Sequence, residues 1–203
     1  MQFIGFMLDA KKIGTDMNML IAERRFNDII TRAEQLIEEH HESYLGRWWK
    51  ARAYTLMGDT EASLHWFMEA MKKAEDDYEE SKISSSMANV YNIRKDWDQS
   101  LNYSEIAFEL NPENVVGVIA RSIALMATGK KKEAYKLLDK NTKLFKEDYQ
   151  KACVAAVKKE KEKMLNYLKK VIPENPHTRV TVQYDPDFAL YRRDPKFRAL
   201  LKS

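Results

Sequence analysis

The chain has 203 residues, of which 44% are hydrophobic, 32% charged and 11% aromatic, with only 6 Gly and 5 Pro. This length suits one domain or one repeat array that buries a sizeable core, and so few turn-forming residues argue against a many-stranded β sandwich or barrel. The net charge of +3 is a cancellation, because residues 1–128 carry −7 and residues 129–203 carry +10. Basic and apolar residues are interleaved at helical spacing in the second half, which is typical of a solvated helix face.

The chain begins with a short apolar segment, residues 1–9. Its apolar run from Phe3 to Leu8 is far shorter than the roughly 20 residues that span a bilayer. The positive charges follow the run instead of preceding it, so the segment is a poor signal peptide. The single Cys153 cannot form an intramolecular disulfide. We therefore expect a cytoplasmic protein without a membrane span, and self-association through residues 1–9 is one alternative role for this segment.

An internal repeat follows. Segments that start at Tyr44, Ser81 and Val115 align with one another at offsets of 37 and then 34 residues. The aligned columns are Ala51/Ala88/Ser122, Tyr54/Tyr91/Leu125, Gly58/Lys95/Gly129, Ser63/Ser100/Ala134, Phe67/Ser104/Leu138 and Ala70/Ala107/Asn141. Small residues permit close approach where two helices cross, and glycine suits the turn between them. The pattern predicts stacked helix-turn-helix units.

The last stretch contains Asp185-Pro186 and Asp194-Pro195. Each pair predicts an Asp N-cap followed by Pro at the first helical position. The apolar residues around them are expected to pack as a lid on the last helix pair: Phe188, Leu190, Phe197, Leu200 and Leu201. Residues 179–184 alternate in polarity, which favours a short extended segment.

The repeat resembles the tetratricopeptide repeat, a 34-residue helix-turn-helix unit, and its end is similar to the capping unit of bacterial arrays. The resemblance implies an all-α, right-handed superhelical array of antiparallel helix pairs. Its units are expected at residues 10–43, 44–80, 81–114, 115–144 and 145–176, with a connecting segment and capping helices at 177–203.

The resemblance also implies a concave groove that binds a peptide or partner protein. The residues carried over to this groove are Trp48, Trp49, Arg52, Thr55, Lys82, Ser85, Ser86, Asn89, Asn92, Ile119 and Ile123. Trp48 and Trp49 are adjacent, so at most one of them faces the groove squarely. Arg and Lys favour acidic side chains or a terminal carboxylate, and Asn bonds a peptide backbone.

No catalytic or metal constellation accompanies the repeat. The six glycines never adopt the spacing of a phosphate-binding loop, and Cys and His lack zinc spacing. We therefore expect a non-catalytic scaffold or adaptor without a cofactor, and we do not expect nucleic acid as its partner. The alternative from another class is an RNA-binding repeat protein that uses the basic residues between Lys158 and Lys170 with Arg192 and Arg193.

Overall fold

The computed structural model describes the backbone of residues 2–202 and the side chains of residues 10–202. Helices account for all of the regular structure in this part of the chain, which contains no strand. The predicted all-α class is therefore confirmed. The backbone from Gln2 onward belongs to the first helix, whereas the side chains of the apolar run at residues 3–8 lie outside the described part, and with them the predicted self-association.

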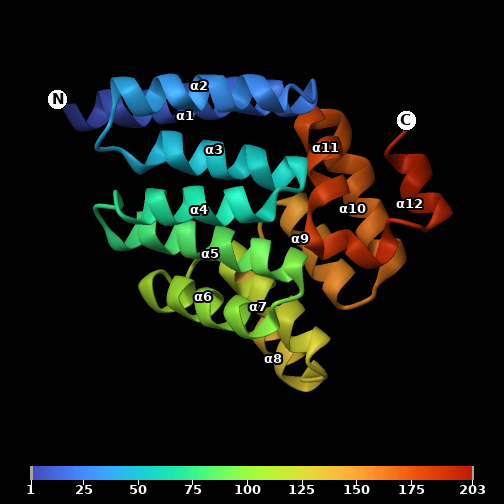
Figure 1. The fold of residues 1–203 in the computed structure, drawn as a ribbon. Helices are drawn as coiled ribbons and strands as arrows, with labels where there is room; N and C mark the ends of the chain where they lie inside the picture. Colours follow the sequence, from blue (N-terminus) through green and yellow to red (C-terminus); the bar gives the residue numbers. More distant parts are fainter. Residues whose placement is uncertain (1, 203) are drawn as a thin grey trace.

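The helices follow one another with short connections. They are α1 (Gln2–Ala22), α2 (Phe26–Glu39), α3 (Tyr44–Met57), α4 (Thr60–Met71), α5 (Asp77–Arg94), α6 (Trp97–Leu110), α7 (Val115–Ala127), α8 (Lys131–Lys140), η1 (Thr142–Leu144), α9 (Asp148–Val157), α10 (Lys161–Glu174), α11 (Pro176–Tyr184), η2 (Pro186–Tyr191) and α12 (Pro195–Leu200). From α1 to α8 each helix packs against the next one in the chain, and α9 packs against α10 and α7. This sequential packing is that of a helical repeat array (Figure 1).

The turn within each helix pair has a recurring backbone conformation. Arg24, Gly58, Lys95, Gly129 and Lys159 all have positive φ, and they follow one another at intervals of 34, 37, 34 and 30 residues. Three of the five are not glycine, although a side chain is disfavoured in this region. The turn geometry thus repeats where the glycine pattern does not.

Side-chain caps set several of the helix starts. Ser43, Asp59, Asp76, Asp96 and Asn114 each accept a hydrogen bond from a backbone N–H in the first turn of the helix that follows. Such caps satisfy donors that have no partner inside the helix. They explain why polar residues separate the apolar helical segments at regular intervals.

The predicted extended segment at residues 179–184 is wrong, because these residues lie in the helix α11. Pro176 occupies its first turn, and Thr181 Oγ1 donates to the carbonyl of His177 at 3.1 Å. The alternation arises because α11 lies between two cores. Val180 belongs to the core built on α1–α5 (the first core), and Val182 to the core built on α7–α10 (the second core). Two residues apart on a helix point in nearly opposite directions, so both faces are apolar.

The C-terminal segment folds back onto the start of the chain. Helix α11 packs against α1 and α3, and Figure 1 shows it beside the ends of these helices. Arg24 donates to Gln183 Oε1 at 2.6 Å and to the Tyr184 hydroxyl at 3.4 Å. Asp185 and Asp194 cap η2 and α12, as predicted. The segment therefore links the last helix pair to the first.

Two of the predicted lid residues pack deep in the second core. Phe188 and Phe197 are fully buried and stack on each other with ring centroids 5.9 Å apart. Leu200 and Leu201 are partly buried against the same core. The placement of Leu190 is a correction, because 73% of its surface is exposed. In the 3-10 helix η2 it points away from Phe188, so only one of the two can face the core.

Candidate functional site

A cavity of about 240 Å³ lies between α3, α5 and the C-terminal segment. Helix α3 contributes Trp48, Arg52 and Thr55, which share one helical face at spacings of four and three residues. Helix α5 contributes Ser86, Asn89 and Ile93 at equivalent spacings. The other wall is formed by Tyr149, Thr181, Tyr184, Asp185 and Pro186. Five of the eleven residues that were carried over from the repeat pattern thus meet at one cavity.

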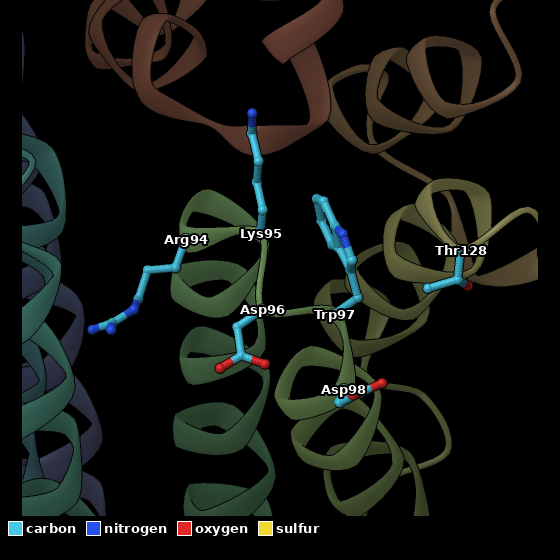
Figure 2. A pocket seen from close by; sticks show the side chains of 6 residues that line it. All are labelled: Arg94, Lys95, Asp96, Trp97, Asp98 and Thr128. Carbon is cyan, nitrogen blue, oxygen red and sulfur yellow. The ribbon is translucent and has the colours of Figure 1, made fainter.

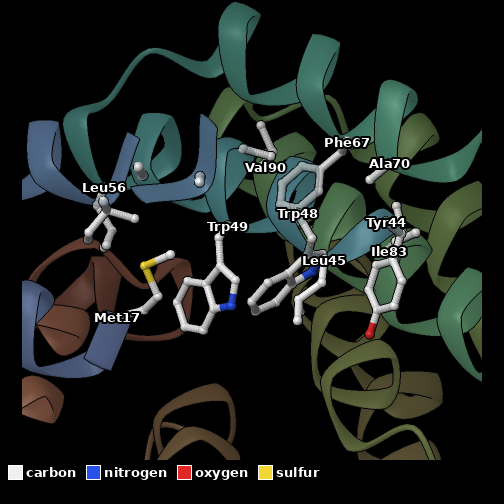
Figure 3. Packing of buried hydrophobic residues seen from close by; sticks show 14 of the residues in the cluster. Met17, Tyr44, Leu45, Trp48, Trp49, Leu56, Phe67, Ala70, Ile83 and Val90 are labelled. Atoms are coloured by element: carbon white, nitrogen blue, oxygen red, sulfur yellow. The ribbon is translucent and has the colours of Figure 1, made fainter. Parts of the chain in front are cut away.

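The two tryptophans have different surroundings. Their rings are edge to face, with centroids 4.9 Å apart. Trp48 lines the cavity, and its Nε1 donates to Ser86 Oγ at 3.1 Å. Trp49 is 4% exposed and belongs to the first core, where Figure 3 shows it next to Met17. Trp48 is therefore the indole that a ligand in the cavity would touch.

Among the described residues, Arg52 is the only cationic one in the cavity lining. Its guanidinium lies 5.4 Å from the ring centroid of Trp48 and 5.0 Å from that of Trp49. It takes part in no ion pair or hydrogen bond with the described residues, and burial lowers its pKa. Tyr149 and then Asp185 act on this pKa in the opposite direction. A half-buried guanidinium without a bonded carboxylate retains most of its capacity to donate hydrogen bonds.

Lys82 lies one helical turn before Ser86 and outside the cavity lining. Its ammonium lies 4.3 Å from the ring centroid of Trp48 and donates to the Tyr44 hydroxyl at 3.3 Å. Burial, and then the charge of Arg52, lower its pKa to about 8, whereas Glu79 acts in the opposite direction. Lys82 therefore adds positive potential behind Trp48 without touching the cavity.

Asn89 supplies an unused acceptor. Its Oδ1 is buried and receives no hydrogen bond, although a buried polar atom is normally paired. The residue projects from α5 into the cavity. A ligand N–H placed there would satisfy this oxygen, and leaving it unsatisfied costs about 1–3 kcal/mol.

The third wall is held by a compact polar cluster. Asp185 Oδ2 accepts from the Tyr149 hydroxyl at 2.6 Å, and its Oδ1 accepts from the backbone N–H of Asp187 at 2.9 Å. Behind it, burial raises the pKa of the Cys153 thiol and of the Asp187 carboxyl. Ligand atoms of Cys153, Asp185 and Asp187 lie within 4.8 Å of one another, which makes them the candidate metal ligands of residues 10–202. Because both oxygens of Asp185 are already bonded, the cluster serves first to anchor η2.

The remaining residues carried over from the repeat pattern are turned into the protein. Asn92 is 4% exposed, its Nδ2 donates to the carbonyl of Ala120 at 3.0 Å, and its Oδ1 accepts from Ser100 Oγ at 2.7 Å. Ser85 is 2% exposed and donates to the carbonyl of Lys82. Ile119 and Ile123 pack in or against the second core. Asn92 thus joins α5 to α6 and α7, Ser85 bonds within α5, and none of these four residues lines the cavity.

Sequence reasoning missed the residues from α9, α11 and η2. Tyr149, Tyr184 and Asp185 line the cavity because the C-terminal segment returns to α1 and α3. The Asp-Pro pairs indicated local helix starts, but nothing in them indicated where the helices dock. Arg24, which contacts Gln183 and Tyr184, gave no signal either.

A larger hollow of about 460 Å³ lies at the turn between α5 and α6. Figure 2 shows its lining residues, which are Arg94, Lys95, Asp96, Trp97, Asp98 and Thr128. All except Trp97 are exposed. Asp96 caps α6, and Arg94 is paired with Glu61. Asp96 and Arg94 are thus already bonded and the hollow is largely exposed, so the cavity between α3 and α5 is the better candidate.

The cysteine and the histidines of residues 10–202 lie outside the lining of the cavity between α3 and α5. Cys153 is buried, and its raised pKa keeps it a thiol at neutral pH. His40 and His41 are exposed at the end of α2, and burial lowers the pKa of His177. None of the described helices is long and apolar enough to cross a membrane.

Comparison with protein-family models finds no match for this chain, and comparison with curated proteins finds none either. The candidate site therefore rests on its geometry.

Proposed function

We propose that this protein is a non-catalytic binding module of the tetratricopeptide type, a right-handed superhelical array that holds a short segment of another protein. The observation that carries the proposal is the shared cavity of α3 and α5, where Trp48, Arg52 and Asn89 converge. These three side chains offer an apolar surface, a cationic donor and an unused acceptor. Together they match the side chain and the backbone of a peptide.

The chemistry of the cavity favours a segment with an acidic side chain or a terminal carboxylate. Arg52 is half-buried and forms no ion pair with residues 10–202, and guanidinium–carboxylate bonds are strong because both groups are charged. The Oδ1 of Asn89 would accept a backbone N–H of the same segment. Tyr184, Asp185 and Pro186 fill the third wall. The segment is therefore expected to insert one or two residues into the cavity instead of lying along an open groove.

The test is selection of short peptides from a displayed random library on the wild-type protein. Affinities of the selected peptides are then measured on Arg52→Gln, Asn89→Ala and Arg198→Gln. Arg198 is an exposed arginine of α12 outside the cavity and serves as the matched control. We expect acidic residues to be enriched, and each cavity variant to lose roughly 1.5–3 kcal/mol, about tenfold or more in Kd.

Trp48 provides a second measurement, because a ligand in the cavity lies against its indole and changes its fluorescence. Selected peptides that bind Arg52→Gln and Asn89→Ala as tightly as the wild type would locate binding elsewhere on the protein. A selection that enriches no peptide would contradict the proposed function itself.

A further inference from the structure

A strongly basic surface lies on α8 and η1, away from the cavity. The stretch from residue 130 to residue 146 contains seven lysines and only two acidic residues. The lysines are Lys130, Lys131, Lys132, Lys136, Lys140, Lys143 and Lys146, and all seven are exposed. Figure 1 shows α8 at an extremity of the molecule. We call this set the α8 lysine surface.

Ion pairing in the second half of the chain makes this surface distinct. The acidic residues Asp139, Asp148, Glu160, Glu162 and Asp194 are each paired with a lysine outside the surface. The lysines that they neutralise are Lys158, Lys151, Lys163, Lys196 and Lys161. Three of the eight basic residues considered in the sequence, Lys158, Lys161 and Lys163, are therefore balanced by carboxylates within the fold.

The lysines of the α8 surface remain without such partners. None of the seven forms an ion pair with residues 10–202, and Lys131 contacts the ring of Tyr135 at 5.2 Å from its centroid. The positive charge of the second half thus collects at α8 and η1, and not along α10 as the sequence suggested. An unpaired cluster of this size attracts polyanions over several ångströms.

The lysines on α8 are arranged in a line. Lys132, Lys136 and Lys140 are four residues apart, so they project from one helical face at steps of about 6 Å along the axis. The opposite face carries Ala134 and Leu138, which are buried. A row of evenly spaced cations fits a linear polyanion with regularly repeated charges.

The composition of the surface selects among polyanions. No large hydrophobic side chain is exposed between residues 130 and 146, so nothing is present to insert into a lipid bilayer. The surface contains no arginine and therefore no planar group for bidentate recognition of a carboxylate or a base edge. Lysines act as point charges, which suffices for contacts with phosphates.

We propose that the α8 lysine surface binds the phosphate backbone of nucleic acid without reading its sequence. This function goes beyond the proposed peptide binding, because none of the seven lysines lines the cavity. The two surfaces are independent, so a protein that lacks one activity can retain the other.

The test uses the complete chain and a fluorescent single-stranded RNA of mixed sequence, about 20 nucleotides long, with a DNA duplex of similar length in parallel. If five phosphates are neutralised, the affinity for RNA falls roughly a hundredfold between about 50 and 200 mM salt. The variant Lys132→Gln/Lys136→Gln/Lys140→Gln should weaken binding and reduce the slope of log K against log salt by about 2.

The matched control is Lys11→Gln/Lys12→Gln/Lys169→Gln. It removes the same charge from three exposed lysines that lie outside the surface and form no ion pair with residues 10–202. The control should keep the wild-type salt slope, and both variants should keep wild-type melting because all six positions are exposed.

Three outcomes would overturn the proposal. The first is no binding of RNA or DNA at about 50 mM salt, where electrostatic attraction is strong. The second is an equal loss of affinity in both variants, which would indicate overall charge instead of a defined surface. The third is tighter binding to polyglutamate or to vesicles of anionic lipid than to either nucleic acid.

Discussion

Replacement of Phe188 tests whether the burial of this one aromatic side chain holds η2 against the cavity between α3 and α5. Phe188 is fully buried, and its ring lies 6.0 Å from that of Tyr149 and 5.9 Å from that of Phe197. Replacing a buried phenylalanine by alanine costs about 3–5 kcal/mol, because apolar burial is lost and a cavity remains. The matched control is Leu190→Ala in the same 3-10 helix. Since Leu190 is 73% exposed, its loss should change the free energy of unfolding by about 0.5 kcal/mol or less.

Thermal unfolding followed by circular dichroism measures the difference. In a protein of this size 1 kcal/mol shifts Tm by about 2–4 °C, so Phe188→Ala should melt roughly 6–20 °C below the wild type. Helical arrays open in parts when neighbouring units uncouple. Hydrogen exchange should therefore show that the amides of α11 lose protection before those of α3 and α5.

A Phe188→Ala protein that melts together with Leu190→Ala would refute this reasoning, because the two residues would then be equivalent. Retained protection of α11 in a destabilised Phe188→Ala protein would show that η2 does not hold α11 in place. The cavity would then owe its third wall to other contacts, such as those of Arg24 with Gln183 and Tyr184 and of Tyr149 with Asp185.

Further predictions concern polar groups and close packing. In a urea titration, Asn92→Ala should lower the free energy of unfolding by about 2 kcal/mol, because it breaks two buried hydrogen bonds. Asn89→Ala should lower it clearly less, because the Oδ1 of Asn89 has no hydrogen-bond partner to lose. Lys82 has a folded pKa of about 8, below the ordinary value of 10.5, so the unfolded state binds more protons above pH 8 and stability rises with pH. The free energy of unfolding that Lys82→Met gains over the wild type should therefore be largest at pH 7 and smaller at pH 10. A gain that is the same at both pH values would contradict the burial of this ammonium. In calorimetry, Gly46→Ala should lower the free energy of unfolding by about 1–3 kcal/mol, because its Cβ would lie 2.9 Å from a backbone oxygen of α2. Gly14→Ala should raise the free energy of unfolding by about 0.5–1 kcal/mol, because its Cβ would meet nothing within 4 Å.

The sequence determined the helical class and the spacing of the helices. Small residues, N-caps and apolar residues recur at fixed offsets, and each acts within one helix or between neighbours in the chain. The same local logic placed Trp48, Arg52 and Asn89 on corresponding faces of α3 and α5. Positions where a non-glycine residue adopts positive φ, such as Lys95, still kept their turns, because packing of the adjacent helices fixes the backbone there.

The tertiary structure alone decided how the chain closes and which polar residues face the cavity. The alternation around Val180 and Val182 has the period of a strand, yet two separate cores require opposite faces of a helix there. Asn92 and Asn89 are similar in sequence context, but Asn92 meets Ala120 and Ser100 while Asn89 meets an open cavity. The contact of Arg24 with Tyr184 joins residues 160 positions apart. Such contacts depend on the summed rotation of all the intervening helices, which no local pattern encodes.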